Sequence, residues 1–361
     1  MDKPLIEIIQ NFCKQRGLVY GICPADILSV AARYIEAVET PFVSGVVGKR
    51  TDPAKSMAGV KSIIVLGMGM ASLKKISLGD MAHTEGETGE TIHGIANRIG
   101  QNLSDTPHSV YTGAISSLAA YEDYHPVLKR LLGELAQEFE AHMQPSQPTQ
   151  SFDYKILVDS GGLNERALAI QAGLGYASKA GHIISPILGS FWYIGLLLTN
   201  LELPYNNPPP MQTCPDDCNL CIKACPTGAI KVTQGDGSLE TQGDGSLVSR
   251  PQGDGLLVSH KVNAMECISY LTQKPGPLTE KEMGQMGNQI YGCDICRNVC
   301  PHNKNQALHE VKVAPEAIIN MDDNALSAIF EKTAANWRGI EIIKRNAGIV
   351  GANCVRPCPP R

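Results

Sequence analysis

The residues with the most evident chemistry in this 361-residue chain are its cysteines. Eight of the 12 lie between Cys214 and Cys300. The first block reads C-x3-C-x2-C-x3-C-P and ends at Pro226; the second reads C-x2-C-x3-C-P and ends at Pro301, with Cys267 alone upstream. In a chain without a secretion signal, such crowding indicates metal ligation or redox chemistry rather than a disulfide framework.

The spacing C-x2-C-x3-C-P is typical of bacterial ferredoxin modules that hold two [4Fe–4S] clusters. The two-residue gap turns two thiolates toward one cube. The cysteine before the proline points the other way and, in two-cluster ferredoxins, ligates the other cluster. This rule predicts two sets of four ligands. The first set is Cys214, Cys218, Cys221 and Cys300, and the second is Cys267, Cys293, Cys296 and Cys225.

Two alternatives to this assignment stay open. Eight cysteines could hold two structural zinc ions, since four-thiolate zinc sites are common, although the paired x3-Cys-Pro endings favour iron–sulfur clusters. Cys214 could be a spare thiol, because the gap after it is three residues rather than two, an insertion that a bulge beside Pro215 would absorb. The cysteines outside the pattern are expected to be buried or free thiols: Cys13, Cys23, Cys354 and Cys358.

The overall composition predicts a folded, soluble protein. The net charge is −5 and 43% of the residues are hydrophobic, which disfavours disorder and gives no global basic field of the kind that many nucleic-acid-binding proteins carry. The longest apolar stretch, residues 186–198, is interrupted by glycine and serine and is too short to cross a bilayer. The opening residues, MDKPLIEIIQ, lack the apolar region of a signal peptide. A cytoplasmic protein without membrane association is therefore predicted.

The first 203 residues predict a layered α/β sheet domain, because helical and strand patterns alternate along them. Helices are expected at residues 5–16, 24–38, 126–142 and 163–172, and strands at residues 18–22, 62–66, 155–158 and 190–199. Gly17 and Gly173 stand where helix C-terminal glycines belong. Ser160 is a candidate N-cap for the last of these helices.

A proline-rich linker after Leu203 marks a domain boundary. We predict a sheet domain over residues 1–203, a ferredoxin-like domain over residues 204–305 and a helical appendage over residues 306–361. Within the middle domain, residues 232–260 contain three QGDG repeats. An Asp-Gly pair between apolar residues predicts an inserted hairpin or a flexible loop. Calcium binding is the alternative, although the repeat spacing is uneven and the GGxGxD pattern of calcium-binding repeats is missing.

Two neighbouring clusters form a path for electrons rather than a catalyst. Joined to a larger α/β domain, such a path implies that this domain holds an acceptor of low-potential electrons. Several further segments are distinctive: residues 267–272 (CISYLT), 287–294 (GNQIYGCD), 158–161 (VDSG), 165–167 (ERA), 172–176 (AGLGY), 189–191 (GSF), 123–125 (DYH) and 344–347 (KRNA). With these segments the chain resembles the epoxyqueuosine reductase family.

This resemblance implies a cobalamin-dependent enzyme related to reductive dehalogenases. Its expected fold is mixed α+β or α/β: a nitroreductase-like corrinoid-binding sheet domain, a ferredoxin-like domain with two [4Fe–4S] clusters and a short helical tail. The clusters would pass electrons from a ferredoxin- or flavodoxin-type donor to cobalt, and cob(I)alamin would reduce epoxyqueuosine in tRNA to queuosine. The corrinoid motif D-x-H-x-x-G is absent, with Leu128 at its last position, in keeping with a family that uses no histidine lower ligand.

The resemblance also assigns site residues. The family's proton donor falls on Asp159, at a strand end, where opening an epoxide requires an acid. The alternative is that Asp159 caps the helix beginning near Gly162. Candidate cofactor contacts are Tyr124, His125, Ser160 and Lys179. Tyr124 and His125 would line the cofactor pocket or form an ordinary core pair.

The chain departs from the family pattern on the substrate side. Residues 175–179 read GYASK instead of Gly-Trp-x-Gly-Lys, a proline near Gly162 is missing, and residues 117–121 (SLAAY) replace an Arg-Tyr-Ala segment. Three hypotheses therefore remain: an epoxyqueuosine reductase-type enzyme acting on tRNA; a paralogous cobalamin and iron–sulfur reductase acting on a small molecule or another corrinoid protein; and a non-catalytic electron-transfer protein. A local basic surface for tRNA, or merely solvated helix charges, would come from Lys332, Arg338, Lys344 and Arg345.

Overall fold

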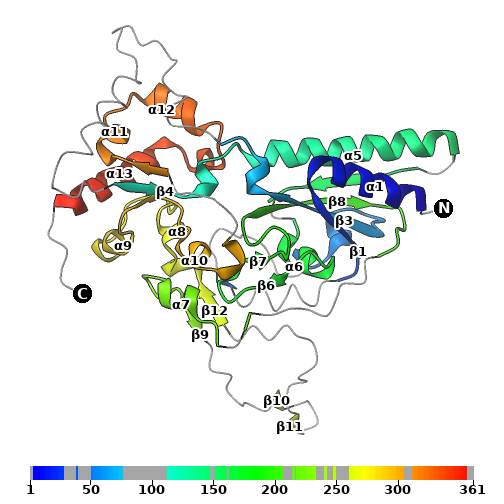
Figure 1. Cartoon of the computed structure of the whole chain (residues 1–361), viewed down its shortest axis with the longest axis horizontal. Coiled ribbons are helices and arrows are strands. Elements are labelled where there is room, and N and C mark those ends of the chain that lie inside the picture. The colour runs from blue at the N-terminus through cyan, green and yellow to red at the C-terminus, as the bar shows by residue number, and fades with distance from the viewer. Residues whose placement is uncertain are drawn as a thin grey trace. The chain divides into compact units, whose positions relative to one another are not determined.

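The computed structural model describes residues 3–27, 38–39, 50–75, 112–146, 151–160, 162–205, 214–215, 217–232, 240–241, 247–248, 260–304 and 311–355. The chain forms two compact units, each discontinuous in sequence (Figure 1). Unit 1 comprises Met1–Ser72, His125–Met265 and Ile295–Gln306, and unit 2 comprises Leu73–Tyr124, Glu266–Asp294 and Ala307–Arg361. The domain boundaries expected after residues 203 and 305 stay predictions.

Unit 1 is built on a four-stranded sheet in the order β1-β3-β8-β5. The strands are β1 (Val19–Pro24), β3 (Ser62–Gly69), β8 (Trp192–Thr199) and β5 (Tyr154–Leu157). All neighbours pair antiparallel, with Ser62 opposite Thr199 in the central pair. Every residue of β3 is buried, because helices cover both faces of the sheet. The strands expected from their apolar runs are confirmed.

Helices α1 (Lys3–Arg16) and α5 (Tyr124–Ser146) lie on one side of the sheet and α6 (Glu165–Gln171) on the other (Figure 1). The side chains of β8 alternate accordingly. Leu196 and Leu198 pack in the core cluster that contains the α6 side chains. Gly195 faces α5, where a Cβ would lie 2.9 Å from the Leu132 side chain. Glycine at this position therefore allows α5 to approach the sheet closely.

Two local expectations for unit 1 are wrong. Both ends of the helix expected over residues 24–38 belong to strands instead: Pro24 is the last residue of β1, and Val38–Glu39 forms β2. Residues 28–37 lie outside the described part. The N-cap of α6 is Asn164 rather than Ser160, because the Asn164 side chain accepts the N–H of Ala167 at 3.1 Å. Capping requires an oxygen within one turn of the helix start, and α6 begins only at Glu165.

The cysteine blocks of unit 1 form short helices beside a small sheet. Helix α7 (Leu220–Ala224) contains Cys221 of the first block, and α10 (Ile295–Asn298) contains Cys296 of the second. Strand β12 (His260–Asn263) pairs with β2 and with β9 (Ile230–Val232). Within the QGDG segment, β10 (Glu240–Thr241) and β11 (Leu247–Val248) pair antiparallel. The hairpin expectation is confirmed for these two segments, while residues 242–246 lie outside the described part.

Unit 2 has a three-stranded sheet in which β4 (Gly113–Ile115) lies between β13 (Gln289–Tyr291) and β14 (Val311–Val313). Its helices are α8 (Ile268–Leu271), α9 (Glu280–Gln285), α11 (Pro315–Ile319), α12 (Asp323–Phe330) and α13 (Ile340–Val355). Apolar residues of α12, α13 and the sheet share one core. Helices α11, α12 and α13 all lie within residues 306–361, where a helical appendage was expected.

The late basic segment has a structural role in unit 2. Arg345 donates to the carbonyl of Lys274 at 2.8 Å, and Lys344 donates to the carbonyl of Met321 and pairs with Asp323. Asn346 is fully buried, and its amide donates to the carbonyls of Thr272 and Ile290 at 2.7 and 2.8 Å. Lys344 and Arg345 thus bind backbone carbonyls of unit 2, and the local basic surface expected from them stays a prediction.

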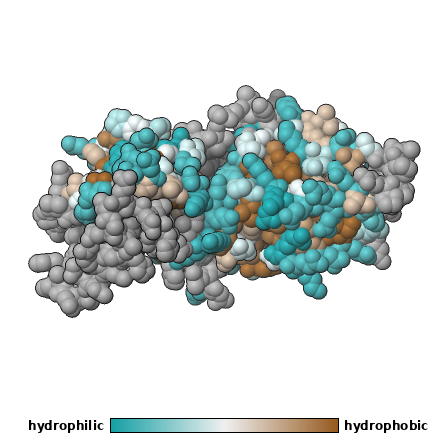
Figure 2. Space-filling model, turned by 90° about the horizontal axis from the view of Figure 1, so that it is seen from above, coloured by the Kyte–Doolittle hydropathy of each residue, from teal (hydrophilic) through white to brown (hydrophobic). Residues whose placement is uncertain are grey.

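On the face drawn in Figure 2, hydrophobic residues form small separate groups among hydrophilic ones. None of the helices in the described ranges is long and apolar enough to cross a membrane.

Cys13 and Cys23 are buried thiols, as expected, with 2% and 1% exposure. The side chain of Cys354 and all of Cys358 lie outside the described residues.

Candidate functional site

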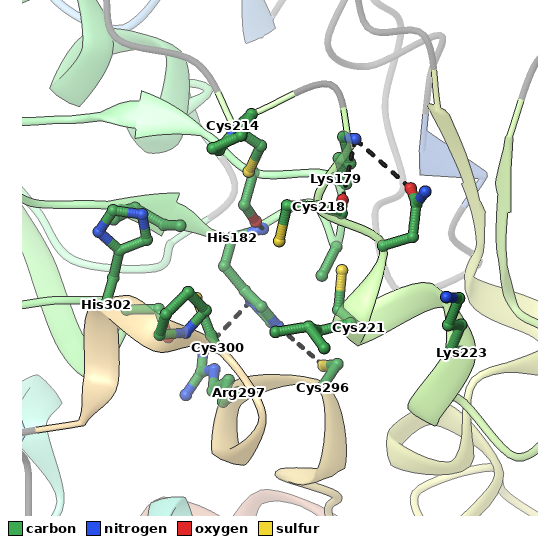
Figure 3. A pocket seen from close by; sticks show the side chains of 18 of the residues that line it. Lys179, His182, Cys214, Cys218, Cys221, Lys223, Cys296, Arg297, Cys300 and His302 are labelled. Carbon is green, nitrogen blue, oxygen red and sulfur yellow. Dashed lines mark hydrogen bonds between the residues drawn. The ribbon is translucent and has the colours of Figure 1, made fainter.

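Five of the eight predicted cluster ligands line one cavity of about 400 Å³ in unit 1 (Figure 3). They are Cys214, Cys218, Cys221, Cys296 and Cys300. All four members of the first predicted set are among them. Helix α7 supplies Cys221, and Cys300 is the N-cap of the short 3-10 turn Pro301–Asn303. In Figure 3 the sulfur atoms of Cys214, Cys218 and Cys221 point toward the middle of the cavity.

The electrostatics of these thiols fit a cationic group. Burial raises the pKa of Cys214, Cys221 and Cys300 above the ordinary thiol value, and the charges of neighbouring cysteines raise it further. A backbone hydrogen bond from Lys179 acts in the opposite direction on the pKa of Cys214. Thiolates gathered in a partly buried cavity repel one another unless metal ions neutralise them. The donor set therefore fits a cluster of iron ions.

The second predicted set is divided between the two units. Cys225 and Cys296 belong to unit 1, and Cys267 and Cys293 belong to unit 2. Cys225 is the C-cap of α7 and Cys267 the N-cap of α8, so each lies at a helix end. Within the described residues, no three or more His, Cys, Asp and Glu side chains gather in a way that would hold a single metal ion. The grouping of this second set stays a prediction.

A short hairpin contacts both cysteine blocks of unit 1. It consists of β6 (Tyr176–Ala177) and β7 (Ile183–Ile184), which pair antiparallel around a turn. Gly181 in this turn has φ +75°, a left-handed conformation that favours glycine. The hairpin is the part of the chain where residues 175–179 depart from the family pattern.

Three side chains of the hairpin make these contacts. Lys179 Nζ donates to the carbonyl of Cys218 at 2.9 Å. The hydroxyl of Tyr176 is hydrogen-bonded to His302 Nε2 at 2.9 Å. His182 Nε2 lies 3.4 Å from Cys296 Sγ. Lys179, expected as a cofactor contact, thus lies in the thiol-lined cavity. The sequence analysis did not single out His182 or His302, and it named Tyr176 only within the family motifs.

The candidate acid Asp159 lies in the loop after β5. Its backbone has φ +44°, and within the described residues it is the one non-glycine position with positive φ. Its side chain is 68% exposed, and Oδ2 lies 3.9 Å from His125 Nε2. Asp159 does not cap α6, because Asn164 does. The capping alternative for Asp159 is therefore wrong, and its carboxylate is accessible from solvent.

A second carboxylate supports this loop. Glu165 Oε1 accepts the backbone N–H of Asp159 at 2.6 Å. Burial raises the pKa of Glu165 to about 8, the negative charge of Asp159 adds to this, and Arg166 and Arg50 oppose it. The sequence analysis missed this role of Glu165, although the segment 165–167 belonged to the family resemblance. A glutamate in the first turn of a helix is commonly explained by its favourable interaction with the helix dipole. Nothing in the sequence therefore indicated its bond to the loop of Asp159.

The other candidate contacts lie near this loop in different environments. Ser160 follows Asp159 and is exposed, His125 is about one-third exposed, and Tyr124 at the start of α5 is buried. The structure thus brings His125 and Asp159 together, and places Lys179 with the cysteines instead. Their roles as cofactor contacts stay predictions.

Comparison with known proteins agrees with this geometry. A family model described as "4Fe-4S double cluster binding domain" matches residues 253–303, and one described as "Epoxyqueuosine reductase QueG, DUF1730" matches residues 95–160. The chain is 29% identical over 272 residues to the epoxyqueuosine reductase of Staphylococcus aureus, and 33% identical over 244 residues to that of Lactococcus garvieae. The chain is a homologue of the epoxyqueuosine reductases.

These alignments cover 72% and 65% of this chain, and 63% and 60% of the two relatives, so the chain spans less than two thirds of their length. A crystal structure of epoxyqueuosine reductase with an epoxyqueuosine-modified tRNA stem loop aligns with a TM-score of 0.70 and 24% identity, over 96% of this chain and 80% of that one. The Streptococcus thermophilus epoxyqueuosine reductase aligns with a TM-score of 0.69 and 26% identity, with the same coverage.

Several expectations are settled by these comparisons. The resemblance to epoxyqueuosine reductases and the mixed helix and sheet fold are confirmed. The double-cluster module is also confirmed, which sets aside the zinc alternative.

Proposed function

We propose that this epoxyqueuosine reductase homologue reduces the epoxide of epoxyqueuosine in tRNA to queuosine, with two [4Fe–4S] clusters and a bound cobalamin. The observation that carries the proposal is the cavity of unit 1, in which the four cysteines of the first predicted set occur together. A low-potential donor of the ferredoxin or flavodoxin type would supply the electrons, and the cytoplasm is the proposed compartment.

The reaction requires both electrons and protons. Converting an epoxide to an alkene consumes two electrons and two protons and releases the oxygen as water. Cobalamin, when bound, supplies a strongly reducing metal centre for this reaction. The cysteine module of the chain holds the clusters that deliver electrons one at a time. What remains for the polar residues after β5 is to provide the protons and hold the substrate oxygen.

Asp159 is the proposed proton donor to the departing oxygen. Its carboxyl is 68% exposed and therefore reachable by a substrate as large as a tRNA anticodon base. His125, 3.9 Å away, would orient this carboxyl and resupply its proton. One Bacillus subtilis epoxyqueuosine reductase has been solved with its catalytic aspartate loop swung out of the active site. We propose that the loop after β5, which holds Asp159 in a left-handed conformation, is the corresponding catalytic loop of this chain.

The paralogue hypothesis remains the second candidate, because of one specific observation. Lys344 and Arg345, two of the four residues expected to attract tRNA, bind carbonyls inside unit 2. A reductase acting on a small molecule would need no basic surface. Binding of an unmodified and an epoxyqueuosine-modified tRNA stem loop, measured at several salt concentrations, separates the two candidates, since phosphate contacts make affinity fall steeply with salt.

The deciding experiment is anaerobic reconstitution of the full chain followed by metal and activity assays. We expect about eight iron and eight sulfide per chain, as two [4Fe–4S] clusters require, one bound cobalamin, and conversion of epoxyqueuosine in a modified stem loop. A protein that binds both clusters and cobalamin but does not convert epoxyqueuosine would support the paralogue hypothesis instead. Clusters without cobalamin uptake would leave an electron-transfer protein, and a protein without iron would overturn the proposal altogether.

A further inference from the structure

We propose that His182 donates a hydrogen bond from Nε2 to the thiolate of Cys296 and thereby raises the reduction potential of the cluster that Cys296 ligates. Arg297 acts as the positioning partner that fixes the proton on Nε2. The inference rests on the iron–sulfur part of the proposed function. It assigns a redox-tuning role to a hairpin residue outside the cysteine blocks.

The backbone of the hairpin holds the imidazole in place. The N–H of His182 donates to Ser178 Oγ at 3.1 Å, and its carbonyl accepts the N–H of Ser178 at 2.8 Å. These two bonds close the turn between β6 and β7, so the ring projects from a short, doubly bonded loop. The position of the ring is therefore determined by the hairpin and does not depend on Cys296.

The two ring nitrogens have different partners, as Figure 3 shows. Arg297 Nη2 lies 3.5 Å from His182 Nδ1, and Cys296 Sγ lies 3.4 Å from Nε2. A guanidinium group only donates hydrogen bonds, so Nδ1 must offer its lone pair to Arg297. In the neutral ring the proton then resides on Nε2, where it faces the sulfur. The arrangement selects the tautomer that donates to the thiolate.

Arg297 is itself held by groups outside the cysteine ligands. Its guanidinium lies over the ring of Phe191 at 5.3 Å, and its carbonyl accepts from the amide of Asn303 at 2.8 Å. Because Arg297 and Cys296 face opposite nitrogens of the ring, a single, oriented N–H remains for the sulfur.

A hydrogen bond to a cluster thiolate is stronger in the reduced state, because the reduced cluster carries one more negative charge. Losing such a bond therefore makes the cluster harder to reduce. Only the difference in the strength of this bond between the two oxidation states shifts the potential, and we expect that difference to change the equilibrium constant for reduction about tenfold. For a one-electron couple a tenfold change equals about 59 mV.

The test compares His182→Leu with His182→Gln in the anaerobically reconstituted full chain. Leucine cannot donate, whereas the glutamine amide can accept from Arg297 and donate to the sulfur. In a redox titration followed by electron paramagnetic resonance, we expect His182→Leu to lower the potential of one cluster by about 59 mV and to leave the other unchanged. In His182→Gln the potential of that cluster should return most of the way to the wild-type value.

Iron and sulfide content separates this inference from the proposed function. A wild-type chain without iron and sulfide would contradict the iron–sulfur assignment itself. Wild-type and His182→Leu proteins with equal cluster content and equal potentials would overturn the role of His182 alone. If the leucine variant does not retain clusters, pulsed electron paramagnetic resonance of the wild type labelled with ¹⁵N-histidine tests the bond instead. Pulsed resonance should detect a histidine nitrogen coupled to a reduced cluster, a signal absent from His182→Gln, and its absence from the wild type would refute the bond.

Discussion

The backbone N–H of Asp159 donates to Glu165 Oε1 across 2.6 Å, so that one carboxylate holds the loop that presents the other. The bond spans the turn in which Asp159 has φ +44°. Asp and Asn adopt this left-handed region more readily than most residues, and the bond to Glu165 supports it from the first turn of α6. The strand end is therefore organised around two acidic side chains with different environments, Asp159 exposed and Glu165 partly buried.

Glu165 is expected to make stability pH-dependent. Its pKa is raised from 4.5 to about 8 in the folded chain, so its ionisation costs more in the folded than in the unfolded state. The stability gained from the neutral form is present below about pH 4.5 and is lost as the pH rises toward about 8. Thermal unfolding midpoints of the wild type should therefore fall, relative to Glu165→Gln, between about pH 5 and about pH 8. Glu138→Gln, on the exposed face of α5, is the control and should follow the wild type. Parallel curves for wild type and Glu165→Gln would contradict this assignment.

Replacing the acid at Asp159 should remove turnover without disturbing the fold. Asp159→Asn keeps a side chain that tolerates positive φ and can no longer give up a proton. We expect activity on modified stem loops to fall about 10²–10⁴-fold, the usual contribution of general acid catalysis, with iron, cobalamin and the unfolding midpoint unchanged. Asp153→Asn, another exposed aspartate of unit 1, should remain active. A fully active Asp159→Asn variant would assign the proton to another group.

Cys214 can be distinguished from a spare thiol by counting iron. As a ligand of the first predicted cluster, its replacement in Cys214→Ser should remove about four of about eight iron ions per chain. The control is Cys13→Ala. Cys13 is a thiol of the core, 2% exposed, and lies outside both cysteine blocks, so its replacement should leave the iron content unchanged. Full iron content in Cys214→Ser would show that this residue is not a required ligand.

Asn303 should be important for the stability of unit 1. It is buried; its amide oxygen accepts the N–H of Ser190 at 2.8 Å, and its amide nitrogen donates to Ser190 Oγ and to the carbonyl of Arg297. Asn303→Ala leaves buried backbone groups unpaired, at a cost of about 2–4 kcal/mol. The expected fall in unfolding midpoint is about 5–15 °C. Asn324→Ala, at an exposed position of α12, should shift the midpoint by less than about 2 °C. Equal midpoints for the two variants would contradict this account.

Local patterns in the sequence were sufficient for much of the fold and for the cysteine module. The apolar run beginning at Ser62 predicted a strand, and β3 is that strand, buried along its whole length. Gly17 predicted the end of α1 and has φ +64°. The gaps within each cysteine block predicted iron–sulfur ligation, because ligands two or three residues apart depend only on a local turn. These features involve neighbours in the chain, so their physics is contained in short segments.

The remaining features depend on contacts between distant residues. His182 and Cys296 are separated by 114 positions, and only the β6–β7 hairpin brings the imidazole to the sulfur. Asp159 and Ser160 were the cap candidates in the sequence, but α6 begins at Glu165, so that Asn164 is its cap. Arg345 looked like a surface charge until its partner carbonyl, 71 residues away, was known. Amino-acid types therefore established which chemistry this protein can carry, whereas the packing of remote segments decided which donor meets which acceptor, since hydrogen bonds and burial act through space and not along the chain.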